Sequence, residues 1–236
     1  MGWNEQGEYE PVAKKKEKAA KQVEKLRKNG ADLSPVVIEG RKIAKTWWGN
    51  AWCVNLESYA DFRNRIGRGS AYVKNGFVVD LKIEEGLVTG RVMGTWLYSI
   101  IIKIDILGEA RKSDVIKTVG RRIESVSDLI EGKFPKDFGD LFLTQEKGLF
   151  PSPGEIHMNC SCPDWAGMCK HVAAVLYGVG ARLDQDPLLF FKLRGVDVNA
   201  FIKASIDEKI GSLMKNAGKT TKRVIKDADI SKIFGV

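Results

Sequence analysis

The chain has 236 residues, of which 38 are Lys or Arg and 30 are Asp or Glu, so its net charge is +8. Hydrophobic residues make up 44% and charged residues 29%, a globular composition that excludes collagen-like and wholly disordered chains. No run approaches the ~20 apolar residues of a membrane helix. No basic stretch followed by an apolar one opens the sequence, so we expect a cytoplasmic protein without membrane contact. The positive charge favours an acidic partner, usually nucleic acid.

Two helices are predicted in the N-terminal part of the chain. Residues 12–29 are rich in Ala, Lys and Glu, which favour helix, and an Asn-Gly stop signal follows. The exposed basic face of this helix is either a solvated surface or a nucleic-acid contact. A second helix is predicted over residues 46–59, because Trp48, Trp52 and Leu56 lie on one face. Such a stripe favours core packing over base stacking.

The middle of the chain has the two-residue alternation of β-strands. Residues 77–84 and 98–106 alternate in this way, and Asn-Gly and Glu-Gly turn signals divide the stretch, so we predict an antiparallel meander over residues 70–106 and the larger core there. From Ser113 to Ile130 the apolar spacing becomes helical, with Ser113 as the N-cap. Further short elements are predicted as a helix over 135–143, a turn over 147–154, and helices over 171–183, 188–194 and 198–210.

Three of the four cysteines lie within ten residues, and a histidine follows them. Cys160 and Cys162 are two positions apart, and Cys169 and His171 follow after six residues. Three thiolates and one imidazole complete a tetrahedral shell for Zn²⁺ and leave no position for a catalytic water. The alternatives are a disulfide or packed free thiols, but this clustering without a secretion signal favours a metal. We therefore predict a structural zinc site and no enzyme.

Other motifs carry less weight. His157 could replace His171 as a ligand, but it lies on the wrong side of the first cysteine pair. Cys53 is distant in sequence and is expected to be a buried apolar residue. A Gly-Lys-Thr sequence at 218–220 imitates a P-loop, but Leu213 stands where the motif requires glycine, so we interpret it as a basic linker. Catalysis by a carboxylate pair stays a third alternative, since such pairs have no sequence signature.

The string Cys160-Ser-Cys-Pro-Asp-Trp followed by Cys169-Lys-His-Val-Ala-Ala-Val-Leu-Tyr resembles the CxC…CxH pattern of the SWIM zinc finger. Residues 38–52, 68–76 and 190–197 are similar to one subgroup of that family, prokaryotic proteins commonly encoded beside Swi/Snf-type helicase-like ATPases. The resemblance implies that the four pattern residues bind zinc, with CxC on a β-hairpin and CxH opening a helix. It also implies a role in DNA or protein interaction beside the ATPase.

Two residues between the ligand pairs are expected to support the site. We expect Trp165 to cover the zinc ion hydrophobically. Asp164 is expected either to orient a ligand or to serve as a turn residue.

The predicted fold class is α+β, an N-terminal antiparallel β-meander with helices followed by a small ββα SWIM-type zinc finger and short C-terminal helices. We divide the chain into a basic helical segment, an α+β domain, the finger with its following helices and a basic tail, over residues 1–32, 33–150, 151–210 and 211–236. The leading function is a zinc-binding protein that binds nucleic acid, with DNA favoured over RNA, and/or assists a helicase-like ATPase. The alternative is a module for protein–protein interaction alone.

Overall fold

The computed structural model describes residues 11–58, 63–122 and 148–216. Its strands are β1 (Val78–Glu84), β2 (Leu87–Met93), β3 (Leu97–Ile104) and β4 (Ile156–Cys160). Its helices are α1 (Val12–Lys28), α2 (Trp47–Glu57), α3 (Arg63–Lys74), α4 (Glu109–Arg122), the short 3₁₀ turn η2 (Pro153–Glu155), α7 (Lys170–Gln185), α8 (Leu189–Leu193) and α9 (Val198–Asn216). The predicted α+β class with C-terminal helices is confirmed.

The strands form one antiparallel sheet in the order β1-β2-β3-β4. The predicted meander supplies the first three strands, and β4 pairs with β3 from Ile156 opposite Ile104 to Cys160 opposite Ile100. Ile100, Ile102 and Ile104 face the core and are at most 2% exposed, as their two-residue spacing predicts. The strand that ends in the first cysteine therefore lies in the same sheet as the meander.

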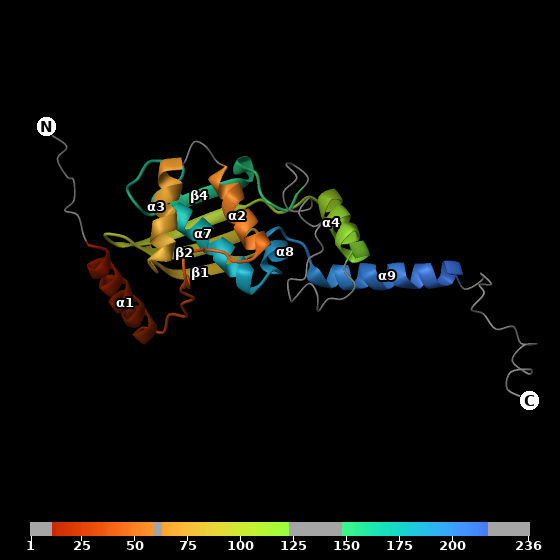
Figure 1. Cartoon of the computed structure of the whole chain (residues 1–236), viewed down its shortest axis with the longest axis horizontal. Coiled ribbons are helices and arrows are strands. Elements are labelled where there is room, and N and C mark those ends of the chain that lie inside the picture. The colour runs from red at the N-terminus through yellow and green to blue at the C-terminus, as the bar shows by residue number, and fades with distance from the viewer. Residues whose placement is uncertain (1–10, 59–62, 123–147, 217–236) are drawn as a thin grey trace, which may run out of the picture.

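Helix α7 lies between the sheet and the helices α2 and α3 (Figure 1). Twelve of its sixteen residues are buried, which explains why its sequence has apolar or small residues on every face. The contact with α3 is very close, because a Cβ atom on Gly69 would lie 2.4 Å from the Cβ of Ala173. Only glycine at this position of α3 lets the two backbones approach so far.

The tryptophans of α2 belong to the core, as predicted. Trp48 and Trp52 are 8% and 3% exposed, and their indole N–H groups donate to main-chain carbonyls of α7 at 2.9 and 2.8 Å. Helix α2 begins after Thr46, whose hydroxyl accepts the N–H of Gly49 and donates to the carboxylate of Asp184 at the far end of α7. These hydrogen bonds satisfy the polar groups that the packing buries.

The structure corrects two predicted elements. Residues 70–74 belong to α3 and not to the sheet, and α4 begins at Glu109 and not after Ser113. Helix α3 contains two glycines and few apolar residues, so its sequence pattern is weak, and packing against α7 stabilises it. In α4 the carbonyl of Gly108 accepts the N–H of Lys112 at 2.9 Å, so helical hydrogen bonding starts before Ser113.

The predictions for 123–130, 135–143 and the basic tail after 216 lie outside the described residues. Helix α1 matches its predicted range closely, and α9 extends six residues beyond the predicted end at 210. Among the described residues, no helix has the length and apolarity needed to cross a membrane.

Candidate metal centre

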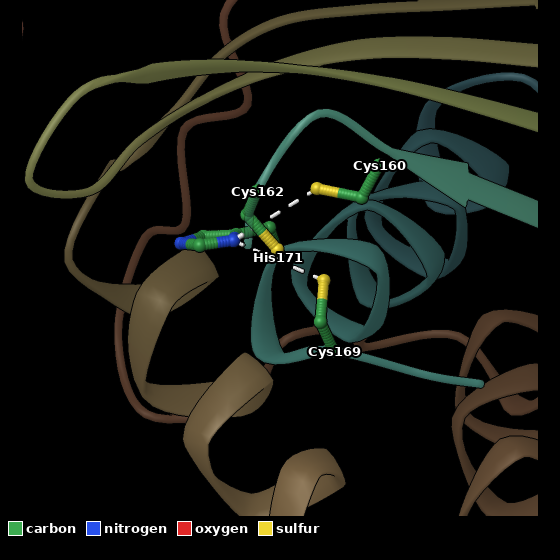
Figure 2. Close-up of side chains that lie close together, drawn as sticks. All are labelled: Cys160, Cys162, Cys169 and His171. Atoms are coloured by element: carbon green, nitrogen blue, oxygen red, sulfur yellow. Dashed lines mark hydrogen bonds between the residues drawn. The ribbon is translucent and has the colours of Figure 1, made fainter. Parts of the chain in front are cut away.

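The four side chains of the CxC…CxH pattern converge at one end of α7 (Figure 2). Cys160 is the last residue of β4 and Cys162 lies in the turn after it. Cys169 is the N-cap of α7, and His171 is the second residue of that helix. The three sulfur atoms and a ring nitrogen of His171 all lie within 4.8 Å of one another. The end of the edge strand β4 and the turn after it supply one pair, and the N-terminus of α7 supplies the other.

The spacing of these atoms fits a tetrahedral zinc shell. Bonds of ~2.3 Å to sulfur and ~2.0–2.1 Å to nitrogen place neighbouring ligand atoms roughly 3.6–3.8 Å apart. The Nδ1 atom of His171 lies 3.8 Å from the sulfur of Cys169 and 4.0 Å from that of Cys160. Three thiolates and an imidazole are also the donors that Zn²⁺ prefers over hard cations. The four residues therefore form a candidate zinc site, in which they would fill the whole shell.

Main-chain N–H groups favour the ionised form of the clustered thiols. The N–H groups of Cys162 and Asp164 oppose the rise in pKa of the Cys160 and Cys162 thiols that burial contributes to. The N–H of Val172, in the first turn of α7, donates to the sulfur of Cys169 at 3.5 Å. Such hydrogen bonds favour the thiolate, the form that binds metal.

The three thiols compete for protons in the absence of a cation. A hydrogen bond from the Cys160 thiol lowers the pKa of Cys169, and hydrogen bonds with His171 and the N–H of Val172 lower it further. The same hydrogen bond to Cys169, together with burial, raises the pKa of Cys160, and burial raises that of Cys162. Three negative charges this close repel one another strongly. A divalent cation at their centre would offset the repulsion and keep all three groups ionised.

Aromatic rings hold the imidazole of His171 in place. The ring is 3% exposed and lies 4.4 Å from the Tyr98 ring at an interplanar angle of 32°. Tyr72 of α3 contacts it edge-on at 5.5 Å. Its Nε2 atom is buried beside Gly94, with no hydrogen-bond partner in the part of the chain that the structure describes. Nδ1 is therefore the nitrogen available to a metal.

The remaining histidine and cysteine lie outside the cluster. His157 is exposed on β4 and its Nε2 lies 3.0 Å from the carboxylate of Asp105. Cys53 is 7% exposed, and burial raises its pKa to about 12, so its thiol is an apolar core group, as predicted.

The expected cover of the site by Trp165 is wrong, because this side chain is 100% exposed. The loop that carries Trp165 is held to α3 by an ion pair between Asp164 and Arg65 at 3.0 Å. Asp164 also accepts the N–H of Ala166 at 3.3 Å, so its side chain serves as a turn residue.

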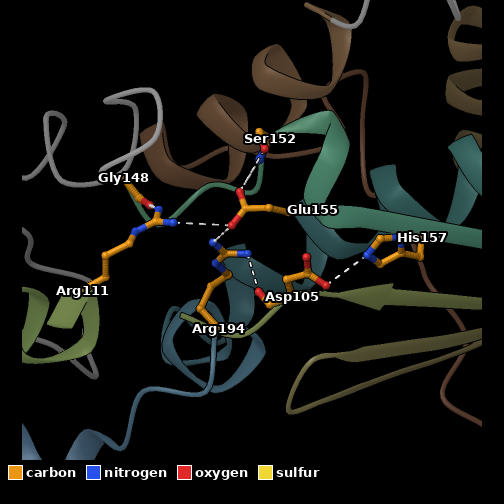
Figure 3. Close-up of polar contacts among 7 residues, drawn as sticks. All are labelled: Asp105, Arg111, Gly148, Ser152, Glu155, His157 and Arg194. Carbon is orange, nitrogen blue, oxygen red and sulfur yellow. Dashed lines mark hydrogen bonds and ion pairs between the residues drawn. The ribbon is translucent and has the colours of Figure 1, made fainter. Parts of the chain in front are cut away.

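A buried ionic network anchors the segment that leads into β4 (Figure 3). Arg194, 1% exposed, donates to a carboxylate oxygen of Glu155 at 2.6 Å and to the carbonyl of Asp105 at 2.5 Å. Arg111 of α4 lies 3.5 Å from the same Glu155 oxygen, and Ser152 donates its N–H to the other oxygen at 2.8 Å. These residues carry no functional signal in the sequence, because charged pairs distant in sequence are visible only in the fold. The network fixes η2, five residues before Cys160.

Residues 153–179 match the SWIM zinc finger family model, a stretch that contains all four clustered residues. The chain is also 35% identical over 156 residues to the uncharacterized protein Rv2102 of Mycobacterium tuberculosis (strain ATCC 25618 / H37Rv). The similar region covers 65% of this chain, and the chain spans 56% of the length of that relative. No solved structure matches the chain. A zinc-binding module of SWIM type is the class of site that the fold and the comparison define.

Proposed function

We propose that the chain is a non-catalytic zinc-finger protein of the cytoplasm that binds nucleic acid, DNA in preference to RNA, beside a Swi/Snf-type helicase-like ATPase. The charge of α1 carries the nucleic-acid part of this proposal. The helix has eight Lys or Arg residues and two Glu, a net charge of +6 out of +8 for the chain. Seven of the eight basic side chains are exposed. The four-ligand cluster supports the non-catalytic part, because a filled zinc shell binds no substrate.

The acidic residues of α1 neutralise little of this charge. Lys21 and Lys28 form ion pairs with Glu17 and Glu24, each one turn earlier in the helix. Six positive charges remain in excess along an exposed surface, which suits contact with phosphates. Binding through such contacts is largely independent of sequence and weakens with salt.

A salt titration of DNA binding tests this proposal. For wild type, the logarithm of the binding constant should fall linearly with that of the salt concentration, by ~0.9 per phosphate contact. Replacing three exposed lysines of α1 by glutamine should flatten the slope by up to ~3. The variant is Lys14→Gln, Lys16→Gln, Lys25→Gln, and the charge-matched control with exposed residues elsewhere is Arg41→Gln, Lys42→Gln, Lys103→Gln. A weak response to salt in wild type would refute nucleic-acid binding.

A stripe on α9 favours the second candidate, an interaction with a protein partner. Helix α9 extends away from the sheet beside α4 (Figure 1). Four of its apolar side chains are 49–75% exposed at helical spacing, namely Ile206, Ile210, Leu213 and Met214. An exposed apolar stripe of this kind is typical of protein interaction sites.

Co-purification with the Swi/Snf-type ATPase of the native host tests this candidate. If α9 binds the ATPase, capture should survive nuclease treatment and should be lost in a Leu213→Glu, Met214→Glu variant. Loss of the ATPase with nuclease alone would show that nucleic acid bridges the two proteins and would contradict direct binding.

A further inference from the structure

Two tryptophans beside the candidate metal centre are unusually exposed. Trp165 is 100% exposed and Trp96 is 72% exposed. Neither indole packs against another ring within the described ranges. Tryptophan is highly buried on average, so two such side chains at one end of a fold indicate a binding surface.

The loop that carries Trp165 is held in position. Asp164 links it to Arg65 of α3 at 3.0 Å and accepts the N–H of Ala166 at 3.3 Å. Trp165 is three residues after Cys162, so their Cα atoms are no more than ~11 Å apart. The indole is therefore presented to solvent by an anchored loop next to the centre.

Trp96 lies in the turn between β2 and β3, and this turn packs against the candidate metal centre. The N–H of Gly94 donates to the carbonyl of Trp96 at 2.8 Å and closes this turn. A Cβ atom on Gly94 would lie 2.9 Å from Nε2 of His171, so the turn rests against the imidazole. In Figure 1 this turn and the loop after β4 both extend toward the end of the molecule where α1 lies.

Positive charge converges between these segments. The ammonium group of Lys15 on α1 lies 5.6 Å from the centre of the Tyr72 ring, and that of Lys170 on α7 lies 5.7 Å from the same ring. Tyr72 in turn contacts His171 at 5.5 Å. Among the described residues neither lysine has a carboxylate partner. Two cations gathered on one ring without a counter-ion suit an anionic ligand.

We propose that Trp96, Trp165, Lys15 and Lys170 form a tryptophan face that binds single-stranded nucleic acid. The indoles stack on unpaired bases, and the lysines contact the phosphates between them. The inference rests on the proposed nucleic-acid function and adds strand selectivity to it. A duplex keeps its bases stacked on one another and offers no free base to an indole, whereas a single strand does.

Fluorescence anisotropy with a labelled DNA of roughly 16 nucleotides, single-stranded or annealed to its complement, tests the tryptophan face. Wild type should bind the single strand more tightly than the duplex. Trp96→Ala and Trp165→Ala should each weaken single-strand binding by roughly 5- to 150-fold, the loss of one base stack, and leave duplex binding unchanged. Replacement of either residue by tyrosine should restore most of the affinity, because the stacking surface returns.

Trp47→Ala is the matched control. Trp47 is 39% exposed and adjoins Thr46, which bonds to Asp184. Asp184 is thirteen residues after His171 on α7, roughly 20 Å along the helix, so this tryptophan is remote from the face. The control should bind both DNA forms as wild type does, and all variants should retain their zinc.

The outcomes separate this inference from the proposed function. Tight duplex binding with no effect of Trp96→Ala or Trp165→Ala on the single strand would overturn the tryptophan face and leave nucleic-acid binding intact. Equal losses on both DNA forms would also overturn it, since stacking acts only on unpaired bases. Failure of wild type to bind either form at low salt would refute the proposed function itself.

Discussion

Replacing Glu155 by glutamine should destabilise the protein by about 2–3 kcal/mol near neutral pH. The reason is the guanidinium of Arg194, which is 1% exposed and loses the charge of its 2.6 Å partner. Breaking a buried ion pair by removing one partner costs about 3–5 kcal/mol. The Glu155 side chain is 22% exposed, so water screens part of this interaction, and the glutamine oxygen still accepts a hydrogen bond. Both effects reduce the expected loss of stability from about 3–5 to about 2–3 kcal/mol.

The loss should depend on pH. Burial by itself raises the pKa of Glu155, but the hydrogen bonds from Arg194 and Ser152 outweigh burial and lower the pKa in the folded state. A carboxylate with a depressed folded pKa contributes its full stabilisation above the unfolded value of ~4.3. That contribution disappears as the pH falls through the folded pKa. Glu155 of wild type is then a neutral acid, and the side chain that replaces it in the variant is a neutral amide.

Urea denaturation of wild type and Glu155→Gln at about pH 7 and in acid measures this difference. Glu109→Gln is the control, because Glu109 is 90% exposed in its pair with Lys112 and should change the free energy of unfolding by less than about 1 kcal/mol. Equal stability of wild type and Glu155→Gln near neutrality would refute the role of this network. So would a difference that persists in acid.

Three further substitutions or modifications test the packing around the centre. Gly69→Ala should destabilise the fold by about 1–3 kcal/mol in thermal unfolding, because its Cβ would lie 2.4 Å from that of Ala173; a wild-type melting temperature would contradict the α3–α7 contact. Gly94→Ala should weaken zinc binding in a chelator competition, since its Cβ would lie 2.9 Å from Nε2 of His171; unchanged affinity would show that the β2–β3 turn does not position the imidazole. Cys53, whose pKa burial raises to about 12, should react with thiol reagents only after denaturation, and mass spectrometry of the native protein detects any exception.

The parts of the fold that sequence predicted well depend on local patterns. The apolar residues of α7 and the alternation of buried residues in β3 follow from apolar spacing. The clustered cysteines come together because few residues separate them. Helix α3 was missed because its stability comes from a contact between Gly69 and Ala173, which are distant in sequence. The pairing of β4 with β3 and the buried contact of Arg194 with Glu155 are similarly non-local.

The candidate site shows the same division. Residue type and spacing predict its four side chains, whereas the aromatic rings that contact His171 come from two other elements, α3 and β3, and only the fold brings them together. The place of Trp165 in the motif predicts that this side chain covers the metal site. In the fold, an ion pair links Asp164 to Arg65 of α3, and the indole of the next residue, Trp165, lies in solvent.

Zinc content of the purified chain and its variants tests the central claim most directly. The account predicts about one equivalent of zinc per chain in wild type, and loss of zinc in the Cys160→Ser, His171→Ala double variant. The control variant replaces the other cysteine and histidine, as Cys53→Ser, His157→Ala, and should retain the wild-type amount. A Cys160→Ser, His171→Ala protein that still carries one equivalent of zinc would contradict the assignment of the metal centre.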